Sequence, residues 1–460
     1  MAYKHFKFEI DNDGIALATL DSPDRSMNII DAEVMHEWEA IIDEASQNDA
    51  IKGVVITSGK KAFGGGADLS MLQNWLENYH EQKLIDKEAA TKKLFEDGRI
   101  LSQLYRKQET CGKPFVAAIN GLALGGFTEM ILACHARVVA EGLDAKIGLP
   151  EVKIGIFPGA GGTQRLPRII HTQEALQAML KGSNIIPKKA KSLGLANALV
   201  PLDQIVSTAK QLINDGLSPV QPWDQKGFKI PGGKVYSPAG FQLFPAANAI
   251  YRRETYDNYP GARAIMKCVY EGLNLPIDLA LQVEARYFAD VLTTTPASMM
   301  LRTLFHSLQA VNKGMRRPKD APKSDIKKVG IIGGGGFMGA GIGYVSAKAG
   351  LDIVLLDRDI QSAEKGRAHC EAIEDKAISK RRSTDAKKHA LLEHIEVSAD
   401  YASLADCDLV IEAVFEDSEV KKLATQQAEK HMKLDAIFAS NTSTIPITDL
   451  AKNSKDATNF

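Results

Sequence analysis

The sequence has almost no net charge, because 56 Lys and Arg residues oppose 57 Asp and Glu residues and leave a formal charge of -1. A protein that binds nucleic acid or an anionic membrane through charge carries a basic excess, so neither partner is expected. No stretch approaches the roughly 20 apolar residues of a membrane helix, and the N-terminal residues alternate polar and apolar types where a signal peptide has an apolar core. These absences predict a cytoplasmic protein without a transmembrane segment.

Cysteine is also scarce, and the chain has five in 460 residues: Cys111, Cys134, Cys268, Cys370 and Cys407. They show neither CxxC spacing nor the density of a disulfide scaffold. Reduced structural thiols are therefore expected, and no metal site is predicted. Hydrophobic residues make up 45% of the chain and charged residues 25%, which is typical of a globular protein with material for two or more cores.

Short β-like runs alternate with helical stretches in the first 200 residues, an order that predicts a layered α/β domain. The expected strands are residues 6–10, 15–20, 53–57, 115–119 and 137–140, and the clearest helix is 30–46. The polar, amphipathic segment 71–107 has few breakers, so a helical, solvent-facing segment is predicted there.

The next region, residues 201–325, is expected to be a helical linker and capping region. Pro, Gly, Tyr and Trp cluster in its first part, and helices resume at about Gly261. One run has helical spacing and is expected to form a docking face on the preceding α/β domain: Leu279, Leu281, Ala285, Phe288 and Leu292. Residues 313–328 are basic and proline-bearing, which is typical of a linker. The expected domains are residues 1–200, 201–325 and 326–460.

The stretch KPFVAAINGLALGGFTEMILACHARVVA, residues 113–140, reads as a buried strand, a glycine turn and an apolar helix that begins near Gly126. Backbone N–H groups at such a helix start are unpaired and point toward whatever occupies the turn. Glu129 lies in the first turn of this helix. Taken alone, it is either a charge partner of the helix N-terminus or a functional carboxyl group.

Three segments carry a family resemblance: AFGGGADL, AINGLALGGFTEM and LPEVKIGIFPGAGGTQRL. They are similar, in their order along the chain, to the signatures of the crotonase superfamily. The resemblance covers residues from about 6 to about 200 and implies a crotonase-like fold that binds an acyl-CoA thioester.

By this resemblance, the amides of Ala67 and Gly126 form an oxyanion hole around the thioester carbonyl. Water addition to a C2=C3 double bond pushes electrons onto that oxygen, and two fixed N–H donors stabilise the enolate-like transition state. Glu129 and Glu151 match the two catalytic glutamates of the family's enoyl-CoA hydratases, one acting as base toward water and the other as acid toward C2. The motifs do not say which glutamate has which role.

Two departures from the family pattern concern the same region. The interval between the two glutamates is about two residues longer, with the excess in residues 141–146, where a surface-turn insertion is expected. Phe127 stands where many relatives have glycine, and its ring either narrows the acyl tunnel or points into the core. A crotonase-fold isomerase or thioester hydrolase stays an alternative, and isomerase activity is also expected as a side reaction.

A second motif begins at Val329, where a strand, a glycine turn, a helix and a second strand ending in Asp357 follow one another. Gly334, Gly336 and Gly339 fit the dinucleotide fingerprint GxGxxG. The turn has one extra glycine, so Gly333 or Gly335 can shift the register by one. Asp357 is expected to accept hydrogen bonds from the adenosine ribose and to favour NAD over NADP, although Arg358 lies next to it.

The segments that follow resemble the NAD-binding domain of the 3-hydroxyacyl-CoA dehydrogenases. The resemblance places Glu416 and Lys421 along the cofactor, and Asn441 and Ser443 beside the nicotinamide and the substrate hydroxyl. The family's catalytic histidine is expected a few residues beyond the position of Phe460, so dehydrogenation is expected of a longer protein and not of this chain.

Together the two parts resemble the front part of the multifunctional alpha subunit of the fatty-acid oxidation complex. This resemblance implies enoyl-CoA hydration in the first part, an NAD cofactor in the last part and a thiolase as a partner subunit. The alternative is a non-catalytic subunit that binds NAD and docks a thiolase.

Overall fold

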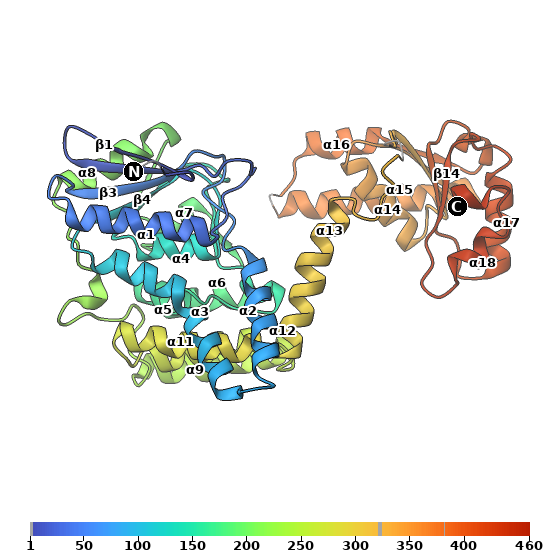
Figure 1. Ribbon diagram of the computed structural model, residues 1–460. Coiled ribbons are helices and arrows are strands. Elements are labelled where there is room, and N and C mark those ends of the chain that lie inside the picture. The colour runs from blue at the N-terminus through green and yellow to red at the C-terminus, as the bar shows by residue number, and fades with distance from the viewer. Residues whose placement is uncertain (1–2, 321–323, 381) are drawn as a thin grey trace. The chain divides into compact units, whose positions relative to one another are not determined.

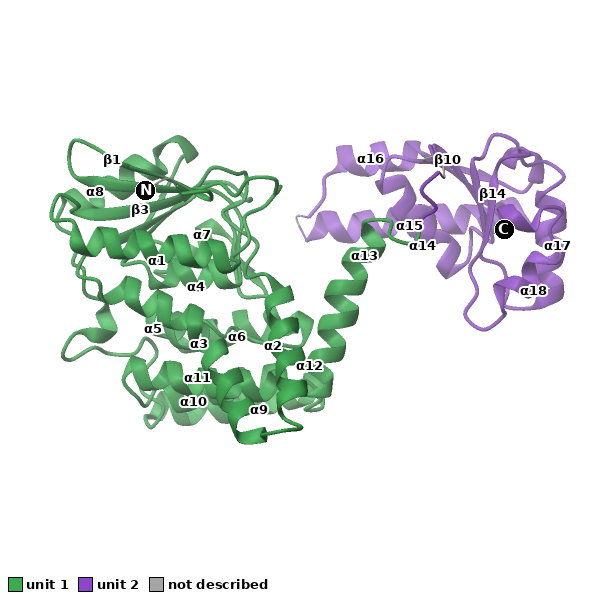
Figure 2. Cartoon of the chain, viewed as in Figure 1, with its two compact units in different colours: residues 1–316 green, residues 317–460 purple. Residues whose placement is uncertain are grey.

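Contacts divide the chain into two compact units, residues 1–316 and 317–460 (Figure 2). The computed structural model describes residues 3–320, 324–380 and 382–460. The boundary between the units falls within the linker expected at 313–328, and residues 321–323 of that linker lie outside the described residues. The region expected to follow the first domain, from residue 201 to residue 316, belongs to the first unit.

The first unit is built on a six-stranded sheet in the order β1-β2-β3-β4-β6-β9 (Figure 1). Its strands are β1 (Phe6–Ile10), β2 (Ile15–Leu20), β3 (Gly53–Ser58), β4 (Phe115–Ile119), β6 (Ala136–Ala140) and β9 (Ala198–Val200). Only β1 and β2 pair antiparallel. Strands β3, β4 and β6 are buried along their whole length, which explains why their sequences are mostly apolar and do not alternate between polar and apolar residues. All five predicted strands are confirmed.

A smaller sheet of β5 (Ala123–Leu124), β7 (Ile147–Gly148) and β8 (Asn184–Ile185) lies beside the glycine turns. The helices of the unit are α1 (Ala32–Gln47), α2 (Leu69–Gln82), α3 (Lys87–Thr110), α4 (Gly126–Ala133), α5 (Gly162–Ile169), α6 (Thr172–Lys181), α7 (Pro187–Ser192), α8 (Ile205–Asn214), α9 (Pro238–Thr255), α10 (Pro260–Gly272), α11 (Ile277–Leu292), α12 (Thr295–Met300) and α13 (Leu308–Asn312). The insertion expected at 141–146 is an exposed turn between β6 and β7, apart from the buried Ala145 and the half-buried Lys146.

The segment expected as one solvent-facing helical stretch is two helices, α2 and α3, and the prediction that it faces solvent is wrong for α3. Leu94, Gly98 and Tyr105 on α3 are buried, because α11 packs along this helix (Figure 1). The many Lys and Glu residues on the other faces of α3 hid this narrow buried stripe in the sequence.

Helix α11 docks on the rest of the unit through one face. Leu281, Ala285, Phe288 and Leu292 are all 7% exposed or less, as the helical spacing predicts. Leu279 is 48% exposed, so its assignment to this face is wrong. It stands two positions before Leu281, which places it about 200° away around the helix.

The second unit has a parallel sheet in the order β12-β11-β10-β13-β14. Its strands are β10 (Lys328–Ile332), β11 (Asp352–Leu356), β12 (Ile395–Ser398), β13 (Leu409–Glu412) and β14 (Ile437–Ser440), and its helices are α14 (Phe337–Lys348), α15 (Ile360–Ser379), α16 (Asp385–Glu393), α17 (Ser418–Ala428) and α18 (Ile447–Ala451). The strand order reverses between β10 and β13, which is where dinucleotide-binding folds place their ligand.

The five cysteines are free, as expected. Within residues 3–320, 324–380 and 382–460, no helix combines the length and the apolar character needed to span a bilayer.

Replacing Phe288 by Ala should lower the free energy of unfolding of the first unit by about 3 to 5 kcal/mol, because the substitution removes a buried ring and leaves a cavity. Leu279→Ala on the same helix is the matched control, and its exposed side chain should contribute less than about 0.5 kcal/mol. Urea unfolding followed by circular dichroism measures both. Equal losses in the two variants would contradict the buried face described for α11.

Candidate functional site

The amides of Ala67 and Gly126 lie close together and have no acceptor among the described residues. Ala67 forms an isolated parallel bridge with Ile30, and this bridge uses the carbonyl of Gly66 and the amide of Asp68. The amide of Ala67 therefore points away from Ile30. Gly126 is the first residue of α4, where a helix leaves its amide unpaired. A Cβ at Gly126 would lie 3.4 Å from the Ala67 nitrogen, so a side chain there would crowd the space that both donors face.

Phe127 points into the core and not into a tunnel. Its ring is fully buried and meets Phe63 edge-on, with ring centroids 6.0 Å apart. Gly64 makes room for it, because a Cβ there would lie 2.1 Å from the Phe127 ring. The core alternative that the sequence left open is thus confirmed.

Glu129 is 3% exposed and its carboxyl group is held by a glycine turn that precedes α5. Its Oε1 atom accepts hydrogen bonds from the amides of Ala160, at 2.7 Å, and Gly162, at 2.8 Å. Burial raises the pKa of Glu129 to about 7, while the two amides and the charge of Arg165 oppose that rise. The carboxyl group can therefore change its protonation state near neutral pH.

Glu151 follows Pro150 and begins a short 3-10 helix, Glu151–Ile154. Its Oε1 atom would lie 3.3 Å from a Cβ at Gly125, so its carboxyl group is next to the turn that leads to Gly126. Its Oε2 atom is inaccessible and has no hydrogen-bond partner in the part of the chain that the structure describes. Burial raises the pKa of Glu151 well above 4.5, and the negative charge of Glu129 raises it further. The structure thus places two carboxyl groups with raised pKa values, those of Glu129 and Glu151, near the unpaired amides of Ala67 and Gly126.

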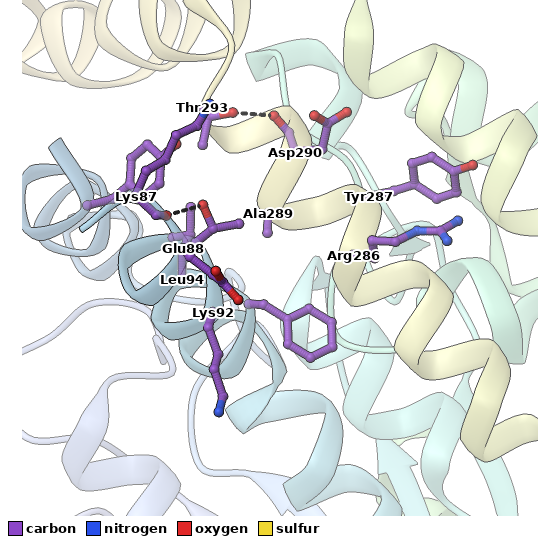
Figure 3. Close-up of a pocket in the computed structure, with 12 residues that line it drawn as sticks. Lys87, Glu88, Lys92, Leu94, Arg286, Tyr287, Ala289, Asp290 and Thr293 are labelled. Atoms are coloured by element: carbon purple, nitrogen blue, oxygen red, sulfur yellow. Dashed lines mark hydrogen bonds between the residues drawn. The ribbon is translucent and has the colours of Figure 1, made fainter. Parts of the chain in front are cut away.

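The largest pocket described, about 1090 Å³, lies between α3 and α11 (Figure 3). Lys87, Glu88 and Leu94 line it from α3, and Arg286, Tyr287 and Asp290 line it from α11, with Thr293 just beyond (Figure 3). None of the residues predicted for the hydratase site lines this pocket.

In the second unit, the glycine turn between β10 and α14 is tightly packed. A Cβ at Gly333 or Gly335 would lie 2.6 or 2.1 Å from a backbone oxygen. A Cβ at Gly334 would lie 2.8 Å from the Cβ of Leu355, and one at Gly339 would lie 2.2 Å from the carbonyl oxygen of Gly333. Both positions are therefore closed to side chains by close packing. Gly336 precedes α14 and faces open space apart from that same carbonyl oxygen at 3.2 Å. Such a helix start is suited to a pyrophosphate.

Asp357 ends β11 next to this turn and is half-buried. Its Oδ2 atom accepts a hydrogen bond from the amide of Gly335 at 2.8 Å, and its Oδ1 atom accepts one from the amide of Arg358. The carboxylate is thereby fixed at the end of the strand, where a ribose would reach it.

Glu416, Lys421, Asn441 and Ser443 come together at the ends of β13 and β14. The Lys421 ammonium is buried and lies 2.8 Å from Glu412, 3.0 Å from the Asn441 carbonyl and 3.2 Å from Glu416. These three acceptors use the whole donor capacity of an ammonium group, so Lys421 would have to release one of them to contact a dinucleotide. Glu416 accepts hydrogen bonds from the Thr442 hydroxyl and the Ser443 amide, which lower its pKa to about 2.

Two stretches of the chain match known families. Residues 10–219 match the enoyl-CoA hydratase/isomerase family, and residues 328–460 match the NAD-binding domain of 3-hydroxyacyl-CoA dehydrogenase. Over 456 residues the chain is 35% identical to the fatty acid oxidation complex subunit alpha of Shewanella amazonensis, with 97% of this chain and 61% of that protein covered. The chain is thus similar to this alpha subunit over almost its whole length.

The same subunit of Shewanella frigidimarina is 34% identical over 453 residues, with the same shares covered, so the chain spans about 61% of the length of these relatives. The family resemblance and the NAD-binding character of the last part are confirmed. Among solved structures, an enoyl-CoA hydratase from Bacillus anthracis is 23% identical with a TM-score of 0.39, covering 67% of this chain and 96% of that one. The (S)-3-hydroxybutyryl-CoA dehydrogenase from Ralstonia eutropha is 37% identical with a TM-score of 0.29, covering 30% and 48%.

Sequence reasoning missed three buried charged residues around the site of the first unit. Glu284 on α11 contacts the same turn that holds Glu129. Arg165 pairs with Glu109 at 2.7 Å, and both side chains are fully buried. Glu284 had a signal in the sequence, because it lies three residues after Leu281 and four before Phe288, within the apolar face of the helix. A charged residue on such a face is rarely buried unless it has polar partners.

The raised pKa of Glu129 predicts a pH dependence of stability. A carboxyl group whose pKa rises on folding favours the folded state while it is protonated. That contribution is complete below about pH 4.5 and is lost as the pH rises through about 7. Glu129→Gln should remove this fall, on the order of 1 to 3 kcal/mol, since the Gln carbonyl can still accept from both amides. Urea unfolding of wild type and variant at about pH 5 and about pH 8 measures it, and parallel pH dependences in the two proteins would contradict the raised pKa.

Proposed function

We propose that the first unit hydrates trans-2-enoyl-CoA to 3-hydroxyacyl-CoA. The observation that carries the proposal is the grouping of two buried carboxyl groups, Glu129 and Glu151, beside the two free amides of Ala67 and Gly126. Hydration of an α,β-unsaturated thioester needs these parts: two donors for the oxygen that gains charge, a base for water and an acid for C2.

The hydrogen-bond partners of the two carboxyl groups support one assignment of roles. Glu129 accepts from two backbone amides, which favour its ionised form, whereas Oε2 of Glu151 has no partner among the described residues and the charge of Glu129 opposes ionisation of Glu151. The residue that ionises first is suited to be the base, and the one that stays protonated is suited to be the acid. Glu129 then takes a proton from the water that attacks C3, and Glu151 gives its proton to C2. Proton exchange with solvent restores both groups.

The two backbone amides stabilise the thioester oxygen in the transition state. As C3 is attacked, charge moves onto the thioester oxygen, and the amides of Ala67 and Gly126 gain interaction energy because the charge grows. The N-terminus of α4 adds a partial positive charge at the same place. The carbonyl of Gly126 also accepts a hydrogen bond from the Tyr105 hydroxyl at 2.8 Å, which helps to hold Gly126 in place.

For the second unit we propose that NAD lies across β10 and β13, with its pyrophosphate at the start of α14 and its adenosine ribose at Asp357. When bound, the nicotinamide would accept hydride from a 3-hydroxyacyl-CoA in the longer protein. Glu416, Asn441 and Ser443 stand at the strand ends toward the nicotinamide side. For the whole protein we also propose a thiolase as a partner subunit and a cytoplasmic location.

An isomerase activity of the first unit is a second candidate. A pair of carboxyl groups that moves protons at C2 and C3 can also move a proton between neighbouring carbons of an enoyl-CoA, and the family match names both activities. The non-catalytic alternative lacks an observation in its favour, because buried carboxyl groups of this kind cost stability and serve no docking role.

Glu129→Gln and Glu151→Gln should each lower the hydration rate at least about a hundredfold, since general acid and base steps contribute on that order. Loss of the crotonyl-CoA enone absorbance measures the rate, and isothermal titration with acetyl-CoA checks that ester binding persists. Glu141→Gln, on an exposed turn, is the control and should match wild type. A double variant with full activity would refute the proposed chemistry.

Asp357→Asn should weaken NADH binding at least about tenfold, because a charged acceptor for the ribose hydroxyls is lost. Asp359→Asn is the matched control two residues away. Asp359 accepts from the amide of Ser362 at the start of α15, and Asn can do the same. Titration of NADH fluorescence measures both constants, and equal affinities would mean that Asp357 does not meet the ribose.

A further inference from the structure

Glu284 is a buried carboxyl group that no step of the proposed hydration uses. It projects from α11 and is 0% exposed. Its Oε1 atom accepts a hydrogen bond from the amide of Gly161 at 2.5 Å. Its Oε2 atom accepts one from the amide of Thr163 at 3.0 Å and another from the Thr163 hydroxyl. A helix far along the chain therefore reaches the turn that holds Glu129.

The turn at residues 160–163 divides its amides between two carboxyl groups. The amides of Ala160 and Gly162 point to Glu129, and those of Gly161 and Thr163 point to Glu284. Gly161 has φ +106°, a conformation that side chains rarely adopt. Because consecutive amides alternate between the two groups, a shift of the turn away from Glu284 would also move both donors of Glu129.

We propose that Glu284 is a positioning residue for the hydratase site, which from α11 fixes the 160–163 turn so that two of its amides are aimed at Glu129. This inference rests on the proposed hydratase function. It makes α11 part of the site's framework, although the helix lies outside residues 10–219 that match the hydratase family.

The packing around α11 supports this role. Phe288, one turn beyond Glu284, would lie 2.6 Å from a Cβ at Gly159 and meets Phe157 with ring centroids 5.6 Å apart. Leu281, on the other side of Glu284, would lie 3.1 Å from a Cβ at Gly161. Helix α11 thus packs against the glycine-rich segment through three residues of one face, Leu281, Glu284 and Phe288.

Glutamine cannot replace Glu284 without moving the turn. Each carboxylate oxygen accepts from a backbone amide, so a Gln side chain must direct its NH2 group at the amide of either Gly161 or Thr163. Two donors then face each other, and a buried donor without an acceptor costs about 1 to 3 kcal/mol.

The charge of Glu284 also acts on the site. Burial and the charge of Glu129 raise the pKa of Glu284 to about 8, and the charge of Glu284 in turn raises the pKa of Glu151. The titratable and charged groups that face Glu284 from the elements packed against it are Glu129, Glu151, Arg165, Arg168 and Cys268. Above about pH 8 Glu284 is ionised, so its removal should lower the pKa of Glu151 in that range.

The test is the pH profile of crotonyl-CoA hydration by the whole chain carrying Glu284→Gln. We expect kcat to fall at least about tenfold, KM to change less than about threefold, and the alkaline limb of kcat/KM to move to lower pH, since Glu151 must stay protonated. The matched control is Glu271→Gln. Glu271 on α10 binds Arg286 and Tyr287 of α11 and does not contact the turn, so this variant should keep the wild-type kcat and pH profile.

A second measurement compares kcat in Thr163→Val and Thr163→Ser. This comparison tests the positioning role of Glu284 even if Glu284→Gln does not fold. Val removes one hydrogen bond to Glu284 and should lower kcat, whereas Ser keeps it and should restore kcat. Wild-type kcat and pH profile in Glu284→Gln, or equal kcat in the two Thr163 variants, would overturn the positioning role. A kcat loss that Glu271→Gln shares, with an unmoved pH profile, would also overturn it in favour of simple packing. Wild-type protein without hydratase activity would instead refute the proposed function.

Discussion

The backbone amides of one glycine-rich turn hold the first unit's site together, and the other parts of the site are arranged around them. Four successive amides, from Ala160 to Thr163, donate to two carboxyl groups that come from α4 and α11. Backbone donors are suited to this task because they cannot rotate away as a side chain can. The turn therefore transfers the rigidity of the surrounding helices to a carboxyl group that must change protonation state.

Burying several carboxyl groups near one another is unfavourable unless something compensates for it. Here the compensation comes from the four amides and from Arg165, which pairs with Glu109, donates to the Ala160 carbonyl at 2.8 Å and is itself fully buried. These partners do not offset the whole cost of burying ionised carboxylates, and the pKa values of Glu129, Glu151 and Glu284 are therefore raised. Groups whose protonation is displaced in this way mark sites of acid and base chemistry more often than structural cores. The second unit shows the contrast, because Glu412 and Lys421 neutralise each other directly.

The sequence predicted those parts of the structure whose causes are local. Five strands of the first sheet and the glycine turn before α14 follow from apolar runs and from backbone shapes that need glycine. Glu129 and Glu151 were predicted because they match motifs of the crotonase superfamily, and each lies close in sequence to a glycine turn. Glu284 and Arg165 were missed because their partners are distant in the chain: Glu109 is 56 residues before Arg165, and Thr163 is 121 residues before Glu284. The same reason explains the wrong prediction that α3 faces solvent, since its buried stripe is covered by helices that the fold brings to it, among them α1, α4 and α11.

The long separation between the turn and its second carboxyl group has a consequence during synthesis. Thr163 and Glu284 are 121 residues apart, and a ribosome adds about 5 to 20 residues per second. The nascent chain therefore carries the complete set of hydratase motifs for roughly 6 to 24 s before Glu284 exists. During that interval two amides of the turn have only water as an acceptor, and the region that α11 later covers is open. The hydratase signatures thus emerge from the ribosome before the residues that complete their fold.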